Sequence, residues 1–212
     1  MIRPEYHILL IIISYLIGSI STSIIVCKYK KIDIRKIGSG NAGATNTVRA
    51  LGKKFGAIVL FLDILKGALP ILIAKFITPE FVFLPVCCSF AVVLGHMFPI
   101  YFSFQGGKGA ATIIGTIYVI FPTGAIICTL TWLCVLFLSG YVGLATIIAA
   151  VSFPLSVYFL ADTNLIFFGF SSMLLILIAH YENILRLLKG KENRFDKIHI
   201  FNKNSIFKRH KF

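Results

Sequence analysis

Long apolar runs separated by short polar loops make up most of the chain, and they predict helices that cross a membrane. Ile8 to Val26 is 19 residues without a charged side chain, which is enough for one crossing at roughly 1.5 Å per helical residue. Phe55 to Ile73 and Phe81 to Ile100 are two more runs of similar length, and Asn164 to Ala179 is the last. The chain is therefore expected to be an all-α integral membrane protein.

Between the third and the last of these runs, residues 110–161 form a stretch of 52 residues with no charged side chain. The number of times this stretch crosses follows from the side on which the basic loops lie. Loops 28–54 and 101–109 are separated by two crossings, so they share a side. The basic tail after His180 is expected on that side too, which basic residues mark as the cytoplasm. Because one crossing precedes the tail, an odd number must fit into the stretch, and three fit.

Breaks at Pro122, at the turn 139–141 and near Ala161 divide the stretch suitably, because proline and glycine interrupt helices. The sequence thus predicts a bundle of seven transmembrane helices, with the amino terminus outside and the carboxyl terminus in the cytoplasm. The segment 110–121 is short for a full span, and a partial helix packed inside the bundle is the alternative.

Composition and charge support a membrane protein. Hydrophobic residues make up 58% of the chain and charged residues 14%, against about 25% charged residues in soluble domains. The net charge of +13 would suit a nucleic-acid binder, yet eight of the 21 Lys and Arg lie in 28–54 and nine in 186–211. Such loops face an anionic inner leaflet, so the expected partner is the lipid bilayer and not nucleic acid. Residues 1–194 are expected to form the membrane domain and 195–212 a basic cytoplasmic tail.

The first basic loop contains a run of small residues that suits an anion. Its backbone N–H groups can converge on a phosphate, its hydroxyl and amide side chains add donors, and an arginine adds a fork for phosphate oxygens. The candidates are Gly38, Ser39, Gly40, Asn41, Gly43, Thr45, Asn46 and Arg49. The three glycines also match a dinucleotide-binding turn, but that motif needs a βαβ unit, and the neighbours here are membrane helices. The alternative is a solvated loop of turn residues.

A second glycine-rich loop follows the third apolar run. Its glycines permit close approach of the backbone, its lysine supplies a positive charge, and a helix that begins just after it would point its positive end at the same ligand. The candidates are His96, Gly106, Gly107, Lys108 and Gly109. No Ser or Thr follows Lys108, so this is not a Walker loop.

The third polar segment lies where the last helix leaves the membrane. His180, Asn183 and Arg186 recur at spacings of three and therefore line one helix face. The alternative is an interfacial helix end whose basic side chains reach toward water. By itself, each of His96 and His180 could equally be a hydrogen-bonding histidine with no role as an acid or base.

Two charged residues and five cysteines lie within the apolar runs. Asp63 and Lys66 are three residues apart, and we expect a structural ion pair because unpaired charges in a membrane are costly. The cysteines show no metal-ligand spacing and are expected to be small buried hydrophobes. Neither a metal nor another cofactor is expected.

Together the three segments resemble the PlsY family, bacterial membrane acyltransferases that use acyl phosphate and glycerol 3-phosphate. The matching positions are Gly38–Asn46 with Arg49, Gly95–Pro99 with Gly106–Thr112, and His180 with Asn183, Arg186 and Glu192. The resemblance extends to about Arg194. Ala42 stands where the family usually has proline, and the turn 140–143 lacks the Arg and Ser of many members.

The resemblance implies acyl transfer from acyl phosphate to the sn-1 hydroxyl of glycerol 3-phosphate, on the cytoplasmic face of the bacterial inner membrane. The products would be 1-acylglycerol 3-phosphate and phosphate, in the first acylation of phospholipid synthesis. The residues expected to act in catalysis are Ser39, Arg49, Lys108, His180 and Asn183. The proton acceptor is either a substrate phosphate oxygen or one of the two histidines. A transporter of a phosphorylated metabolite is the alternative function, against which the lack of an inverted repeat argues.

Overall fold

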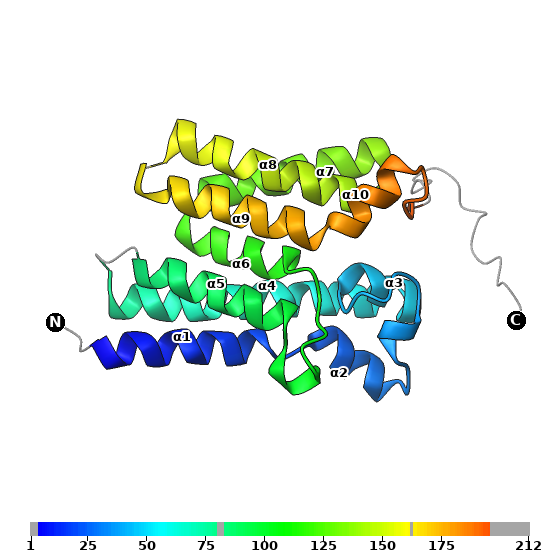
Figure 1. The fold of residues 1–212 in the computed structure, drawn as a ribbon, viewed down its shortest axis with the longest axis horizontal. Helices are drawn as coiled ribbons and strands as arrows, with labels where there is room; N and C mark the ends of the chain where they lie inside the picture. The colour runs from blue at the N-terminus through cyan, green and yellow to red at the C-terminus, as the bar shows by residue number, and fades with distance from the viewer. Residues whose placement is uncertain (1–3, 80–82, 162, 196–212) are drawn as a thin grey trace, which may run out of the picture.

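The structure is a computed structural model, and it describes residues 4–79, 83–161 and 163–195. The described residues are helical apart from turns and loops, as predicted, and the helices lie side by side in a bundle (Figure 1). The helices, with the 3-10 turns η1 to η3, are α1 Pro4–Gly18, α2 Thr22–Tyr29, η1 Ile34–Lys36, α3 Ala44–Leu51, α4 Lys53–Ile77, α5 Phe83–Met97, η2 Ile100–Phe102, α6 Ala110–Ile120, α7 Pro122–Ser139, α8 Val142–Leu160, η3 Thr163–Leu165, α9 Ile166–Ala179 and α10 Tyr181–Leu188. The basic tail expected over 195–212 lies outside the described residues except for Phe195.

Several of these helices are long and apolar enough to cross a bilayer. Five described segments pass by length and composition: Glu5–Tyr29, Lys53–Ile77, Phe83–Phe102, Pro122–Ser139 and Val142–Leu160. A sixth is added if η3 with α9 and α10, which are bent by 61°, count as one span. The helix α6 is apolar but has only 11 residues. The chain is thus a multi-pass integral membrane protein with five or six spans by this criterion, where the sequence predicted seven.

The first span is broken, although the sequence predicted one uninterrupted helix from Ile8 to Val26. The helix α1 ends at Gly18 and α2 begins at Thr22. The break frees the carbonyl oxygen of Ile20, which accepts a hydrogen bond of 2.8 Å from Nζ of Lys66 on α4. Oδ1 of Asp63 lies 2.9 Å from the same Nζ and accepts a bond of 2.6 Å from Oγ1 of Thr22. The expected ion pair therefore exists, and it satisfies the polar groups of the broken span.

Close contact between α4 and α6 depends on glycine. A Cβ at Gly67 of α4 would collide with the carbonyl oxygen of Thr112, and a Cβ at Gly115 of α6 would collide with that of Ile64. Small residues at such crossings let two helix backbones approach within a membrane. The contact fixes the first turn of α6, and with it Lys108, beside the middle of α4.

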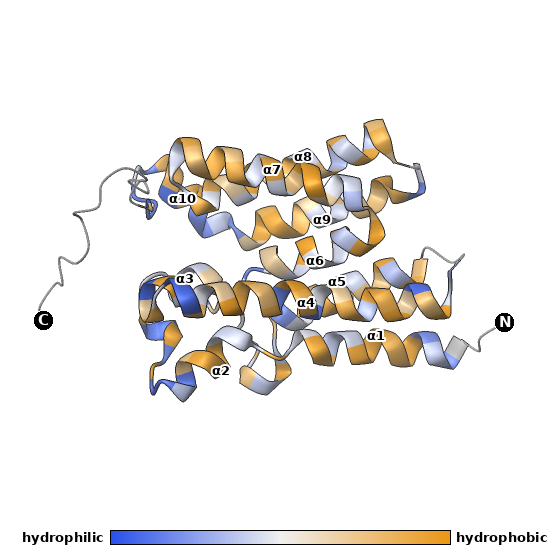
Figure 2. Cartoon of the chain, turned by 180° about the vertical axis from the view of Figure 1, so that it is seen from behind, coloured by the Kyte–Doolittle hydropathy of each residue, from blue (hydrophilic) through white to orange (hydrophobic). Residues whose placement is uncertain are grey.

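The apolar core lies between α5, α6, α7, α8 and α9. The ring of Phe168 on α9 meets those of Phe90 and Phe153 edge to face, each at a centroid distance of 5.6 Å. At one end of the bundle lie α2, α3, α10 and their loops, and this end is the hydrophilic one, while the helices are largely hydrophobic elsewhere (Figure 2). The first and third polar segments found in the sequence belong to this end (Figure 2), and Lys108 of the second contacts Asn183 of α10.

Candidate active site

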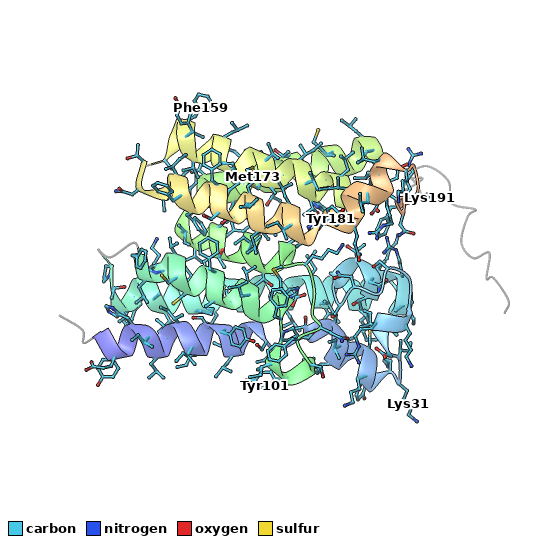
Figure 3. All side chains as sticks on the ribbon, in the orientation of Figure 1. Lys31, Tyr101, Phe159, Met173, Tyr181 and Lys191 are labelled. Atoms are coloured by element: carbon cyan, nitrogen blue, oxygen red, sulfur yellow. The ribbon has the colours of Figure 1, made fainter. Side chains whose placement is uncertain are left out.

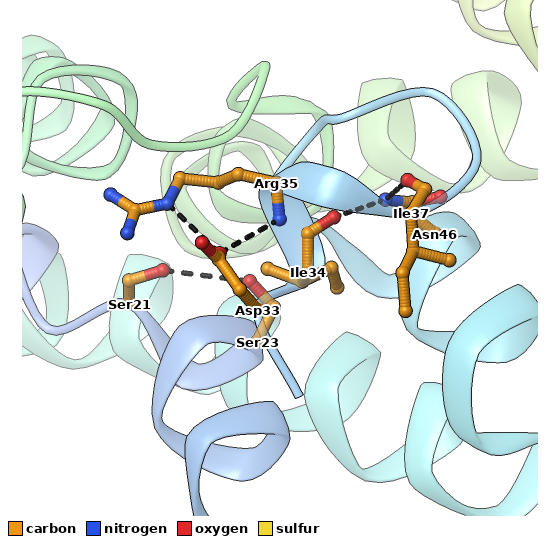
Figure 4. Close-up of polar contacts among 7 residues, drawn as sticks. All are labelled: Ser21, Ser23, Asp33, Ile34, Arg35, Ile37 and Asn46. Atoms are coloured by element: carbon orange, nitrogen blue, oxygen red, sulfur yellow. Dashed lines mark hydrogen bonds and ion pairs between the residues drawn. The ribbon is translucent and has the colours of Figure 1, made fainter. Parts of the chain in front are cut away.

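The first glycine-rich loop is held in shape by one buried amide. The side chain of Asn46 donates from Nδ2 to the carbonyl oxygens of Ile34 (3.1 Å) and Ile37 (2.8 Å), and Oδ1 accepts from the backbone N–H of Ser39 (3.2 Å). Figure 4 shows Asn46 against η1, whose first turn Asp33 caps by accepting from the N–H of Arg35 at 3.2 Å. Both amide protons of Asn46 are thus used within the loop. Its geometry is that of a residue that shapes the loop. The amide oxygen can only accept, so no donor of this side chain is left for the phosphate contact expected of it.

The second glycine-rich loop folds back on His96 at the end of α5. The N–H groups of Gly106 and Gly107 donate to the carbonyl oxygens of Met97 and His96, both at 3.1 Å. A Cβ on Gly107 would collide with the His96 ring, so only glycine fits there. Nδ1 of that ring lies 3.7 Å from Oδ1 of Asp63, which places the loop beside the ion pair of the broken span.

The third segment lies at the bend between α9 and α10. Nδ1 of His180 lies 2.9 Å from the carbonyl oxygen of Ile176. A carbonyl can only accept, so Nδ1 carries the proton and Nε2 is left as an acceptor. One helical turn further on, Oδ1 of Asn183 accepts a short hydrogen bond from Nζ of Lys108. The second and third segments are therefore in direct contact.

These segments surround one cavity of about 420 Å³. The lining residues that the sequence singled out as phosphate-binding or catalytic are Ser39, Asn41, Gly43, Thr45, Asn46, Arg49, His96, Lys108, Gly109, His180 and Asn183. Of the remaining candidates, Gly38, Gly40, Gly106 and Gly107 do not line it, although the first two adopt positive φ angles of 56° and 70° that shape the loop. The geometry thus brings together most of the candidates and gives these four glycines a supporting position.

Two helices point their amino-terminal ends at the cavity. Gly43 precedes α3 and Gly109 precedes α6, which begins where the sequence predicted, and both glycines line the cavity wall. Neither helix has a side-chain cap on its first N–H groups. Unpaired N–H groups and the helix dipole favour an anion at such a position.

Cations and the carboxylates of Asp63 and Glu192 line the cavity. Glu192 accepts hydrogen bonds from Nδ2 of Asn183 (2.7 Å) and Nε of Arg186 (2.8 Å). Burial lowers the pKa of the Lys108 ammonium, and the neighbouring Arg186 lowers it further, while Glu182 and Glu192 act in the opposite direction. Lys108 therefore loses its charge at a lower pH than an exposed lysine does.

Beyond this polar end the cavity continues as an apolar limb that runs between the helices. On the α7 to α9 side it is lined by residues such as Trp132, Phe153 and Ser172. Tyr118 of α6 also lines it, nine positions after Gly109, so the lining follows α6 for about 13 Å at roughly 1.5 Å per helical residue. The cavity thus joins an anion-binding end to an apolar limb.

Comparison with known proteins identifies the family of this chain. The family model described as glycerol-3-phosphate acyltransferase matches residues 8–190. The chain belongs to the glycerol-3-phosphate acyltransferase family. This agrees with the resemblance read from the three motifs.

Similar proteins with the name glycerol-3-phosphate acyltransferase come from several bacteria. The Aquifex aeolicus protein is 44% identical over 189 residues, which cover 88% of this chain and 97% of that protein. The Endomicrobium trichonymphae protein is 43% identical over 198 residues, covering 92% of this chain and 98% of the relative.

Two crystal structures of PlsY, an integral membrane glycerol 3-phosphate acyltransferase, have the same fold. The glycerol 3-phosphate form superposes with a TM-score of 0.86 at 42% identity and covers 90% of this chain and 96% of that one. The lysophosphatidic acid form gives a TM-score of 0.84 at 42% identity, with 91% and 96% covered.

Sequence reasoning left some residues of this acyltransferase-family site without a role. Arg186 and Glu192 line the cavity, and the sequence placed both in the third motif without assigning them to phosphate binding or catalysis. The apolar limb was missed because its residues, such as Trp132 and Ser172, look like any other membrane-facing position in the sequence. No group of three His, Cys, Asp or Glu that could hold a metal occurs in the part of the chain that the structure describes.

Proposed function

We propose that the protein transfers a fatty acyl group from acyl phosphate to the sn-1 hydroxyl of glycerol 3-phosphate. The hydroxyl oxygen attacks the carbonyl carbon, the bond from that carbon to the phosphate oxygen breaks, and phosphate leaves. The hydroxyl proton ends on a phosphate oxygen or on a histidine. The products are 1-acylglycerol 3-phosphate and inorganic phosphate.

The observation that supports this reaction is the form of the cavity. Both substrates carry a phosphate, and the polar end offers Arg49, Lys108 and two helix amino termini for the two anions. One substrate also carries a long alkyl chain, which the limb between the helices suits. Bringing the two reacting groups together, with donors near the carbonyl oxygen, accounts for much of such a rate.

For the proton we propose that a phosphate oxygen of the substrate is the acceptor, with Ser39, His180 and Asn183 orienting the reacting groups. Asn183 supports this role because it already contacts Lys108 and Glu192. His180 is the competing acceptor, because its Nε2 is free to take a proton. His96 competes less well by geometry, because the glycine-rich loop packs against its ring.

We also propose the topology and location expected from the sequence. With α6 counted as a short seventh crossing, the amino terminus is outside and the polar end with the cavity faces the cytoplasm of the bacterial inner membrane. The clustering of basic residues at that end supports this orientation. A green fluorescent protein fused to the carboxyl terminus should fluoresce, whereas alkaline phosphatase fused there should be inactive. The reverse result would show that the topology is opposite to the one proposed.

The test of the reaction uses purified protein in detergent with acyl phosphate and radiolabelled glycerol 3-phosphate. We expect lipid-soluble label from the wild type, and a loss of at least about 100-fold in Lys108→Ala, because removing a charged group from such a site costs several kcal/mol of transition-state stabilisation. Lys36→Ala is the matched control, since Lys36 is an exposed lysine at the same end of the molecule.

A transporter of a phosphorylated metabolite was the alternative, and the names of the relatives do not favour it. The same preparation separates the two functions. Folded wild type that forms no labelled lipid would contradict the acyltransferase, and uptake of glycerol 3-phosphate into liposomes would then be measured.

A further inference from the structure

The side chain of Arg49 has an unusual setting for a cation at the mouth of this cavity. It lies in the last turn of α3, it is exposed, and it lines the cavity. Among the residues that the structure describes, no carboxylate or carbonyl oxygen accepts a hydrogen bond from its guanidinium. The guanidinium instead lies over an aromatic ring: Cζ is 5.9 Å from the centroid of the Phe195 ring.

This contact leaves the guanidinium free for a ligand. A cation–π contact at this distance places no hydrogen-bond acceptor against the N–H groups, which point outward in the guanidinium plane. Five donors therefore stay available for phosphate oxygens while the orientation of the plane is restricted. A carboxylate partner would have the opposite effect, because it would occupy the donors that a phosphate needs.

Phe195 is itself held in place by the far side of the bundle. Its backbone N–H donates to the carbonyl oxygen of Gly140, in the turn between α7 and α8, at 2.8 Å. The preceding residue, Arg194, donates from Nε to the carbonyl oxygen of Ser139 at 3.1 Å and lies 5.7 Å from the Tyr141 ring centroid. Three contacts thus fix this end of the chain segment to one turn.

The start of the same segment is fixed as well. Glu192 is bonded to Asn183 and Arg186 of α10. Residues 190–195 therefore form a short strap from α10 to the turn between α7 and α8, near the position of Lys191 in Figure 3. The helix α3, which carries Arg49, packs against α2, α4 and η1. The Phe195 ring thus brings Arg49 into contact with a segment that is fixed to the turn between α7 and α8.

We propose that Phe195 is a positioning residue, which orients the Arg49 guanidinium toward a substrate phosphate through the face of its ring. The proposal rests on the proposed acyl transfer, since it assigns a task to Arg49 in that reaction. Phe195 touches neither substrate in this scheme. It acts only through the arginine.

The first test compares Phe195→Leu with Phe195→Tyr in the acyltransferase assay, varying each substrate in turn. Leucine keeps apolar bulk but lacks the ring face, and tyrosine keeps the face. We expect Phe195→Leu to lower kcat/KM for at least one substrate by about threefold to tenfold, as loss of a cation–π contact would, with an unchanged melting temperature. Phe195→Tyr should be close to wild type. Phe159→Leu is the control, because Phe159 is exposed on α8 at the opposite end of the molecule (Figure 3). This substitution should leave kcat/KM unchanged.

The second test asks whether the effect passes through Arg49. Lysine lacks the flat, forked head whose orientation the ring restricts, so Phe195→Leu should cost clearly less in an Arg49→Lys background than in the wild type. Equal costs in both backgrounds would overturn the proposal, as would a Phe195→Leu protein with wild-type kinetics or a Phe195→Tyr protein as impaired as Phe195→Leu. These outcomes leave the acyltransferase standing. Absence of labelled lipid from the wild type would instead contradict the proposed reaction, and the role of Phe195 with it.

Discussion

At the scale of single residues, the two cavity histidines differ in what their rings can do. Nδ1 of His180 is committed to the carbonyl oxygen of Ile176, which leaves Nε2 free. The His96 ring lies against Gly107 and near Asp63, so its surroundings suit support of the loop. Geometry alone makes His180 the stronger candidate for contact with a reacting group.

The histidines are tested by substitution with glutamine, which keeps hydrogen-bonding ability but cannot act as a base. If a substrate phosphate accepts the proton, His180→Gln and His96→Gln should each lose less than about 10³-fold in kcat, within the usual range for a lost hydrogen-bond donor or acceptor. Single-turnover and steady-state kinetics would be compared. A greater loss in either variant, with unchanged substrate affinity, would show that the histidine is the base.

The lowered pKa of Lys108 predicts how activity depends on pH. Below its pKa the ammonium is charged and can hold a phosphate; as pH rises through that value, the charge and the activity are lost, earlier than for an ordinary lysine. In Lys108→Arg the guanidinium stays charged throughout, so the alkaline limb of the kcat/KM profile should move to higher pH even if the maximum is lower. Coincident alkaline limbs in the two proteins would mean that another group titrates.

At the scale of elements, the close crossing of α4 and α6 determines where the second glycine-rich loop lies. Gly67 and Gly115 allow the crossing, and α6 begins directly after Lys108 and Gly109. A disturbance of this crossing therefore reaches the site through the first turn of α6, although neither Gly67 nor Gly115 lines the cavity.

The crossing is tested by Gly115→Ala. The added Cβ meets the backbone of α4, which cannot move aside as a side chain can, so we expect a loss of about 1–3 kcal/mol in stability, typical of overpacking. The melting temperature in detergent should fall, and kcat/KM should fall with it. Leu69→Phe adds volume on the exposed face of α4 and should leave both unchanged. A stable Gly115→Ala protein would show that the helices separate without cost.

The elements also show which parts of the structure could be predicted from sequence. The start of α6 was predictable because Gly109 and the preceding lysine interrupt an apolar run. The break between α1 and α2 was not, because residues 19–21 are uncharged and its stabilising partner, Lys66, lies 46 positions away from Ile20. The bend at His180 was equally hidden, since neither proline nor glycine marks it.

At the scale of the whole molecule, polar residues were easier to place than apolar ones. Glycine and cation clusters stand out against a hydrophobic chain, so most of the polar end was found. The apolar limb was not, because packing between distant helices decides which of many similar side chains line it. For the same reason nothing in the sequence marked Phe195 as functional, because its proposed role depends on contacts with α3 and with the turn at Gly140.

The limb predicts how the protein selects its acyl donor. Ser172 lines its far part, is 2% exposed, and its hydroxyl has no hydrogen-bond partner among the described residues. Ser172→Phe should fill this part, so kcat/KM with palmitoyl phosphate should fall much more than with octanoyl phosphate. Ser172→Ala is the matched control and should change neither. An equal fall with both donors would mean that the alkyl chain does not reach Ser172.

Three residues that line the cavity, Leu60, Tyr118 and Leu133, are exposed side chains on the apolar helices α4, α6 and α7. We therefore expect the limb to open to the lipid between these helices, while the charged end meets water. Acyl phosphate would then reach the site by diffusion within the membrane, and glycerol 3-phosphate by diffusion through water. The rate should follow the mole fraction of acyl phosphate in the micelle or bilayer, so that adding inert lipid at a constant bulk concentration slows the enzyme by surface dilution alone.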